Sequence, residues 1–263
     1  MSLVDNFGLL DEWGLLEFKD PGDIYVFHAL KRVKDLKAKD ELKPGDSTGD
    51  THRLVRTWYV DSQEYLDRHV DFMRKLCDDN GARLYLIPQV RNRLVCRRVL
   101  LKKLVDLLDD PNVRDENIMR SAICGCHQSR RKRWIVDIDF DDMHLCDSSL
   151  TKVQTHDLVR KDSEYGLKIL DGVSSKIAKI HEKNGIGTPE VLTYPTVHGF
   201  GIVCSPFDKL DLAGRLMPED VGEERCDDSI DTFLLPNDNY LSYQILNDDI
   251  KTKGGMMLVY ANL

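Results

Sequence analysis

Long apolar runs are missing from this chain of 263 residues. No stretch approaches the roughly 18 consecutive apolar residues that a membrane-spanning helix needs. The first residues lack the basic start and apolar core of a signal peptide. Internal repeats and low-complexity tracts are also missing, and 41% of the residues are hydrophobic, which excludes a disordered chain. We therefore expect a folded protein that does not interact with membranes.

The cysteines are scattered along the chain. The seven cysteines are odd in number, which excludes a simple disulfide framework and favours reduced thiols in a cytoplasmic protein. The one dense group is Cys124-Gly-Cys126-His127. A structural zinc site needs a second pair of ligands, and only His144 and Cys146 lie nearby. We do not expect zinc to be bound.

Negative charge dominates the chain, but it is unevenly distributed. The formal net charge is -8, yet residues 83–133 contain thirteen Lys/Arg and five Asp/Glu, which makes this segment +8 and the remainder -16. An acidic total argues against indiscriminate coating of nucleic acid. The basic segment still permits a local surface that follows a phosphate backbone. The alternative is an ordinary solvated helix face.

Two modules are predicted from the pattern of strands and helices. Residues 1–129 read as an N-terminal α/β module, with strands over 24–31, 53–60 and 83–88 and helices over 62–80 and 93–109. Residues 130–263 have strands over 134–139, 190–196, 199–205, 240–247 and 256–261, and helices over 163–183 and 206–216. The second pattern is close to the split βαβ, ferredoxin-like arrangement. We predict a two-lobed α/β (α+β) fold whose lobes pack as one compact unit.

Two aspartates occur within the apolar strand Trp134-Ile-Val-Asp137-Ile-Asp139. Side chains alternate along a strand, so Asp137 and Asp139 share one face. Burying two carboxylates is costly without a partner, and a divalent cation removes that cost. Oxygen ligands at this spacing suit Mg²⁺ or Mn²⁺, and two such ions can support nucleotidyl transfer. The alternative is an edge strand whose aspartates face water.

A third acid is available near the end of the chain. Asp249 follows the predicted strand 240–247 and is our preferred third ligand, with Asp248 second. Taken alone, these acids fit equally well a capped turn before Gly254-Gly255.

The three motifs together resemble those of the archaeo-eukaryotic primase superfamily, which includes the primase-polymerases of phages and plasmids. Lys132–Asp139 resembles motif one, Tyr194–Asp208 the motif-two hairpin, and Asp249–Tyr260 the motif-three region. The resemblance implies an RRM-like catalytic sheet, Asp137, Asp139 and Asp249 as metal ligands, and a motif-two histidine that contacts nucleotide phosphates. It also implies primer synthesis on a single-stranded template.

One departure from the family pattern concerns the hairpin. In related viral sequences a histidine stands where this chain has Gly201, whereas Thr196-Val197-His198 matches small-x-His three residues earlier. Either His198 has taken over the role or phosphate binding is weakened. The nucleotide-binding candidates are His198, Thr196 and Lys251. As an alternative, His198 is a simple turn residue.

Basic residues supply candidates for binding a single-stranded DNA or RNA template. These candidates are Arg91, Arg93, Arg97, Arg98, Arg130, Arg131, Lys132 and Arg133. The leading prediction is a metal-dependent primase or primase-polymerase for viral or mobile-element replication, using nucleoside triphosphates in the host cytoplasm with a replicative helicase as a further partner. The alternatives are a catalytically degenerate binding protein of the same fold and a metal-dependent phosphodiesterase.

Overall fold

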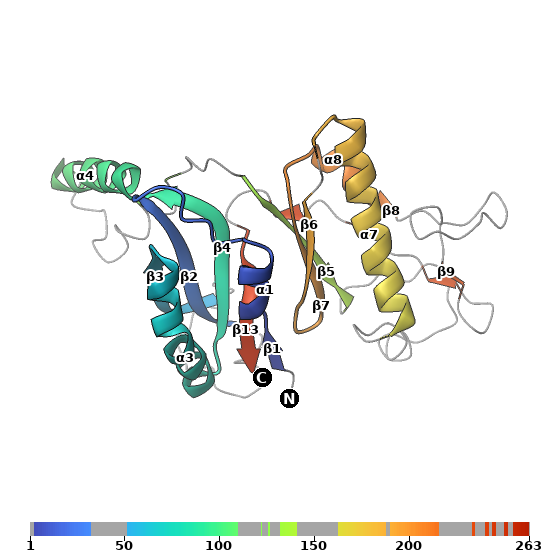
Figure 1. Ribbon diagram of the computed structural model, residues 1–263, viewed down its shortest axis with the longest axis horizontal. Helices are drawn as coiled ribbons and strands as arrows, with labels where there is room; N and C mark the ends of the chain where they lie inside the picture. Colours follow the sequence, from blue (N-terminus) through green and yellow to red (C-terminus); the bar gives the residue numbers. More distant parts are fainter. Residues whose placement is uncertain are drawn as a thin grey trace. The chain divides into compact units, whose positions relative to one another are not determined.

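Two units make up the chain in the computed structural model (Figure 1). The structure describes residues 3–32, 52–109, 122, 126, 132–140, 163–187, 190–215, 233–234, 240–241, 244–245, 250–251 and 255–262. Unit 1 comprises Met1–Lys132 and Gly254–Leu263, and unit 2 comprises Arg133–Lys253. Both combine helices with antiparallel sheets, so the predicted α+β class is confirmed.

Unit 1 is built on a five-stranded antiparallel sheet in the order β1-β13-β4-β2-β3. Its strands are β1 (Leu3–Asp5), β2 (Asp23–Arg32), β3 (His52–Val60), β4 (Arg83–Asn92) and β13 (Met257–Asn262). The three strands predicted for the N-terminal module are confirmed as β2, β3 and β4. Residues 23–30 of β2 are all buried, because this strand is interior and both of its faces are covered.

The strand predicted over 256–261 exists, but its expected place in the second module is wrong. It forms β13, which pairs with β1 through Val4 and Ala261 and with β4 through Leu86 and Met257. A short apolar run specifies that a strand forms and not which strand it pairs with. The last described strand therefore belongs to the sheet of unit 1.

Helix α3 (Gln63–Asn80) packs on the sheet of unit 1 and ends as the sequence predicts. The Ser62 hydroxyl accepts a hydrogen bond from the Tyr65 amide at 3.2 Å, which satisfies one free donor of the first turn. Gly81 terminates the helix in the left-handed conformation, with φ of 56°, that glycine adopts without strain. Met73 and Cys77 lie on its buried side. Helix α1 (Phe7–Glu12) precedes it in the same unit.

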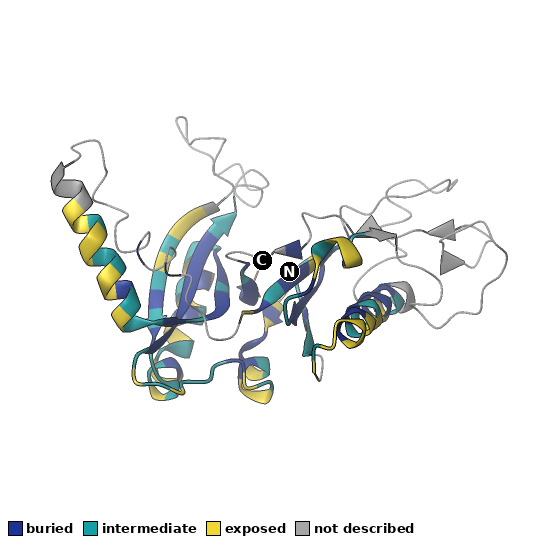
Figure 2. Ribbon diagram, turned by 90° about the horizontal axis from the view of Figure 1, so that it is seen from above, coloured by how far each residue is buried: buried dark blue, intermediate teal, exposed yellow. Residues whose placement is uncertain are grey.

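Helix α4 (Arg93–Asp109) occupies the predicted range, but its apolar residues surround it. Val95 and Cys96 pack against β2 and β4, whereas Leu94 and Leu101 are 59% and 62% exposed. The apolar residues of this helix therefore do not gather on one side. Figure 2 shows the outer side of this helix as largely exposed.

Unit 2 contains a four-stranded antiparallel sheet in the order β12-β5-β7-β6. Its strands are β5 (Trp134–Asp139), β6 (Val191–Pro195), β7 (Gly199–Cys204) and β12 (Ile250–Lys251). Helix α7 (Glu164–Lys183) lies between β5 and β6 in the sequence, so β5 and β6 run parallel with β7 inserted between them. The Ser163 hydroxyl caps α7 by accepting from the Gly166 amide at 3.1 Å.

Helix α7 supplies the core of unit 2. Its apolar side packs against one face of the sheet, which buries Val136 and Ile138 of β5 together with Ile202 of β7. The helix contributes Ile169, Leu170, Val173, Ile177 and Ile180 to this core. Because β5 is interior and one of its faces is buried, its register and the direction of each side chain are fixed.

Several short elements complete unit 2. They are α8 (Lys209–Leu212), β8 (Gly214–Arg215), β9 (Phe233–Leu234), β10 (Tyr240–Leu241) and β11 (Gln244–Ile245). The single strand expected over 240–247 is wrong: β10 pairs with β9, β11 pairs with β8, and the strand beside β5 is β12. Within the described ranges of both units, no helix is long and apolar enough to cross a membrane.

Candidate functional site

Strand β5 presents the two aspartates on one face of the sheet. Val136 and Ile138 point into the core, so Asp137 and Asp139 lie on the opposite face. Their Cα atoms are about 6.6 Å apart along an extended strand. At that spacing, two carboxylates can bind one divalent cation at about 2.1 Å.

Exposure distinguishes the two carboxylates. Asp139 is half-buried, but Asp137 is exposed. The prediction that both carboxylates are buried is therefore wrong for Asp137, and there is no burial cost at this residue for a cation to offset. The edge-strand alternative is also wrong in part, since β5 is hydrogen-bonded on both sides, to β12 and to β7.

Each aspartate of β5 is paired with a glycine of the neighbouring strand β7. Asp137 pairs with Gly201, and Asp139 pairs with Gly199. Directly opposed residues of an antiparallel pair point to the same face, so neither carboxylate has a β7 side chain directly opposite it. A methyl group at Gly199 would lie 2.0 Å from the Ile138 carbonyl oxygen. Only glycine fits there without moving the backbone.

A side chain of the neighbouring strand β6 occupies the space above Gly201. Tyr194 of β6 pairs with Gly201, and the far end of its side chain covers that residue. A methyl group at Gly201 would lie 2.1 Å from Cζ and 2.3 Å from the hydroxyl oxygen of Tyr194. The tyrosine is only 2% exposed. Gly201 therefore lies directly beneath a buried phenol.

The third acid cannot be placed from the described residues. Asp248 and Asp249 both lie outside them. The first residue of β12, Ile250, pairs with Val136, the residue before Asp137. Lys251, a nucleotide-binding candidate, pairs through its backbone with Ile135. Among the described side chains there is no group of three or more His, Cys, Asp or Glu that could hold a metal ion.

His198 and Thr196 form the turn between β6 and β7. The Thr196 amide donates to the Gly199 carbonyl oxygen at 2.9 Å, and the Phe140 amide donates to the His198 carbonyl oxygen at 3.2 Å. The second bond ties the turn to the residue after Asp139. The His198 side chain is exposed. The structure therefore brings His198 to the aspartate end of the sheet.

The four candidate arginines on β4 and α4, namely Arg91, Arg93, Arg97 and Arg98, have different environments. Arg91 is 3% exposed, and its Nη1 donates to the Cys126 carbonyl oxygen. Arg93 forms an ion pair with Asp61, and this guanidinium holds the pKa of the Asp61 carboxyl below its usual value. Arg97 and Arg98 are exposed on α4. Of these four, Arg97 and Arg98 are the ones available to bind phosphates.

The basic residues before β5, Arg130 to Arg133, also differ in their environments. Lys132 is exposed, whereas Arg133 is 3% exposed and its Nε lies 3.7 Å from a Glu190 carboxylate oxygen. Arg130 and Arg131 lie outside the described residues. Arg133 is thus a buried ion-pair residue, and the run of four cations does not form one uniform surface.

Four cysteines are described, and all four are buried free thiols. Cys96 of α4 lies beside Cys126, and burial first, then this neighbour, raises the pKa of Cys96 to about 12. Burial likewise raises the pKa of Cys77 and of Cys204 to about 12. Of the remaining zinc candidates, Cys124, His127, His144 and Cys146 lie outside the described residues.

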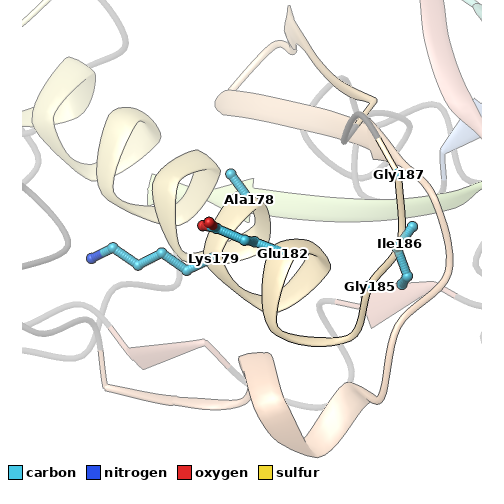
Figure 3. A pocket seen from close by; sticks show the side chains of 6 residues that line it. All are labelled: Ala178, Lys179, Glu182, Gly185, Ile186 and Gly187. Carbon is cyan, nitrogen blue, oxygen red and sulfur yellow. The ribbon is translucent and has the colours of Figure 1, made fainter.

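A hollow of about 440 Å³ lies at the end of α7 (Figure 3). It is lined by Ala178, Lys179, Glu182, Gly185, Ile186 and Gly187. The chain continues from here into Val191, which pairs with Cys204 at the end of the sheet where β5 begins. The hollow therefore lies away from Asp139 and contains none of the predicted site residues.

Among the described residues of this site, sequence reasoning missed the role of Tyr194. The signal was Gly201 itself, because a glycine inside a strand often marks the close approach of another group. Comparison of the chain with protein-family models, with curated proteins and with solved structures yields no match. The site is therefore interpreted from its own residues.

Proposed function

We propose that the protein is a metal-dependent nucleotidyltransferase of the primase or primase-polymerase type. The observation that carries this proposal is the placement of Asp137 and Asp139 on one face of an interior strand, each opposite a glycine. Gly199 places no side chain opposite Asp139, and Asp137 is exposed, so a cation and the phosphates that it binds have access to these carboxylates. The strand order β12-β5-β7-β6, with α7 between β5 and β6, agrees with the RRM-like sheet that the resemblance implies.

The donor set fits a hard cation. Asp137 and Asp139 would hold Mg²⁺ or Mn²⁺ through carboxylate oxygens, with Asp249 as the proposed third ligand. Bound there, such ions stabilise charge on an attacking 3′-hydroxyl and on a leaving pyrophosphate. His198, exposed at the aspartate end of the sheet, would donate to a nucleoside triphosphate, together with Thr196 and Lys251.

The proposed template is single-stranded DNA or RNA. Arg97, Arg98 and Lys132 are exposed cations that could contact its phosphates. A replicative helicase is the proposed further partner, and the host cytoplasm the proposed location. These assignments rest on the resemblance and on the charge of the segment 83–133.

A binding protein of the same fold is the second candidate. The observation that favours it is the cover of Gly201 by Tyr194, which leaves no histidine at the family position. Such a protein would hold nucleic acid or nucleotide without extending a primer. A metal-dependent phosphodiesterase that uses the same carboxylates is the third candidate. It differs from the other two because it would cleave nucleic acid.

Primer synthesis on single-stranded DNA with nucleoside triphosphates and Mg²⁺ or Mn²⁺ tests the proposal. We expect products from the wild type and none from Asp137→Ala/Asp139→Ala. Asp171→Ala, which changes an exposed carboxylate on α7, is the matched control and should retain activity. Binding of DNA without product in either metal would favour the binding protein, and cleavage of DNA would favour the phosphodiesterase.

A further inference from the structure

Tyr194, Gly201 and Asp137 form one row across three neighbouring strands of unit 2. Tyr194 of β6 pairs with Gly201 of β7, which pairs in turn with Asp137 of β5. Residues paired in this way point to the same face. That face is the one opposite the core packed by α7.

The phenol is directed along this row toward Asp137. The parts of Tyr194 nearest to a methyl group on Gly201 are Cζ, the hydroxyl oxygen and Cε1, at 2.1, 2.3 and 2.6 Å. These atoms belong to the far end of the side chain. A side chain that starts on β6 and has its tip above β7 points at β5, whose backbone lies about 4.8 Å further on.

Burial fixes the ring while the carboxylate stays open. Tyr194 is 2% exposed, whereas Asp137 is exposed. Asp137 therefore has a rigid neighbour on its β7 side and is itself exposed to solvent. A buried tyrosine hydroxyl requires a hydrogen-bond partner, and a carboxylate is a strong acceptor for one.

We infer that Tyr194 is a positioning residue for metal binding: its hydroxyl donates a hydrogen bond to one carboxylate oxygen of Asp137 and leaves the other oxygen directed at the cation. This inference rests on the proposed function, because it assigns a role to Tyr194 only if Asp137 binds a metal. Partners of this kind fix the orientation of metal-binding carboxylates, and their loss weakens metal affinity by about 10–100-fold.

The inference also accounts for Gly201. Any side chain at this position would displace the phenol from the row. Gly201 and Tyr194 then act together: the glycine leaves the space that the phenol occupies. Gly201 is also the position at which the resemblance implies a histidine. The position is occupied by a polar group from β6 and not by one from β7.

Titration of the full-length protein with Mn²⁺, followed by the electron paramagnetic resonance signal of the free ion, tests the inference. We expect Tyr194→Phe to weaken Mn²⁺ affinity about tenfold or more. Phenylalanine keeps the ring, so a role in packing alone would leave the affinity unchanged. The matched control is Tyr260→Phe, which removes a hydroxyl that donates to Asp78 at 2.8 Å in unit 1. This control should bind Mn²⁺ like the wild type.

Each outcome is decisive. If Asp137→Ala abolishes binding and Tyr194→Phe does not weaken it, the inference is overturned and the metal site stands. If the wild type does not bind Mn²⁺, or binds it equally well after Asp137→Ala, both the metal site and the role of Tyr194 are overturned. Gly201→Ala should reproduce the loss seen in Tyr194→Phe, because the added methyl displaces the phenol.

Discussion

The side chain of Tyr194 on β6 lies across Gly201 on β7, so close that no other residue fits beneath it. We predict that Gly201→Ala destabilises the protein by about 1–3 kcal/mol, the usual cost of overpacking. The added methyl would overlap Cζ and the hydroxyl of the tyrosine. Urea unfolding measures the change.

A double-mutant cycle tests whether the two residues act as one packing unit. Gly201→Ala should cost less in the Tyr194→Ala background, where the ring is gone, with a coupling energy of about 0.5–3 kcal/mol. Equal costs of Gly201→Ala in both backgrounds would contradict the close contact.

Asp137→Ala should separate stability from metal binding. In the inferred arrangement, Asp137→Ala leaves the buried Tyr194 hydroxyl without its acceptor, so we expect the free energy of unfolding without metal to fall by about 1–3 kcal/mol. Mn²⁺ at a hundred times its dissociation constant should stabilise the wild type by about 2.7 kcal/mol and the variant not at all. Thermal unfolding with and without Mn²⁺ measures both effects. Equal stabilisation of the two proteins would place the ion elsewhere.

Arg97 and Arg98 are predicted to bind phosphates, whereas Arg91 is predicted to hold the fold. Arg97→Ala/Arg98→Ala should weaken binding of single-stranded DNA and lower the slope of log affinity against log salt by about 1.4, or 0.7 for each lost contact. Fluorescence anisotropy over a range of salt concentrations measures this slope.

Arg91→Ala should instead cost about 1–3 kcal/mol of stability, because the buried carbonyl of Cys126 loses its donor. Urea unfolding checks this value. A salt slope that falls with Arg91→Ala in the folded protein would show that the buried guanidinium contacts nucleic acid after all.

The buried thiols should make the protein sensitive to alkali. Burial raises the pKa of Cys77 and of Cys204 from 9.0 to about 12, so the folded protein keeps these thiols neutral. Their contribution to stability is complete below about pH 9 and is lost as the pH rises toward 12. Urea unfolding at pH 7, 9 and 10.5 should show this decline.

Thiol labelling gives a second measurement of the same effect. At pH 8 the thiolate fraction for a pKa of about 12 is roughly a thousandfold below that for 9.0. Cys204 should therefore react with iodoacetamide only after unfolding. Rapid labelling of Cys204 in the folded protein would contradict its burial.

The ranges of the helices and strands could be predicted from the sequence better than the pairing of the strands. Strand β5 occupies the range predicted for it, because it is a short apolar run. Helix α4 also occupies its predicted range, although its apolar residues do not gather on one side. The partner of β13 did not follow, since its six residues would suit any sheet with an open edge. Only the completed fold determines that it lies between β1 and β4.

Some features of the candidate site could likewise be predicted from the sequence, and others could not. The common face of Asp137 and Asp139 follows from alternation along one strand, which is a local property. The position of Tyr194 depends on the register of β6 against β7, which no single strand contains. The burial of Arg91 and Arg133 was likewise hidden, because a count of charges does not distinguish a guanidinium inside the protein from one on its surface.

Strand β13 imposes an order on folding during synthesis. It is translated after the whole of unit 2, yet it lies between β1 and β4. Until it is made, β1 has no partner strand and one edge of β4 is open, whereas the strands of unit 2 are already present. Domains generally fold from the N-terminus onward during translation. Here unit 2 can fold before the sheet of unit 1 is complete, because that sheet needs β13. The nascent protein therefore carries an unpaired apolar edge, the kind of surface that invites aggregation, for as long as residues 133–253 take to be made.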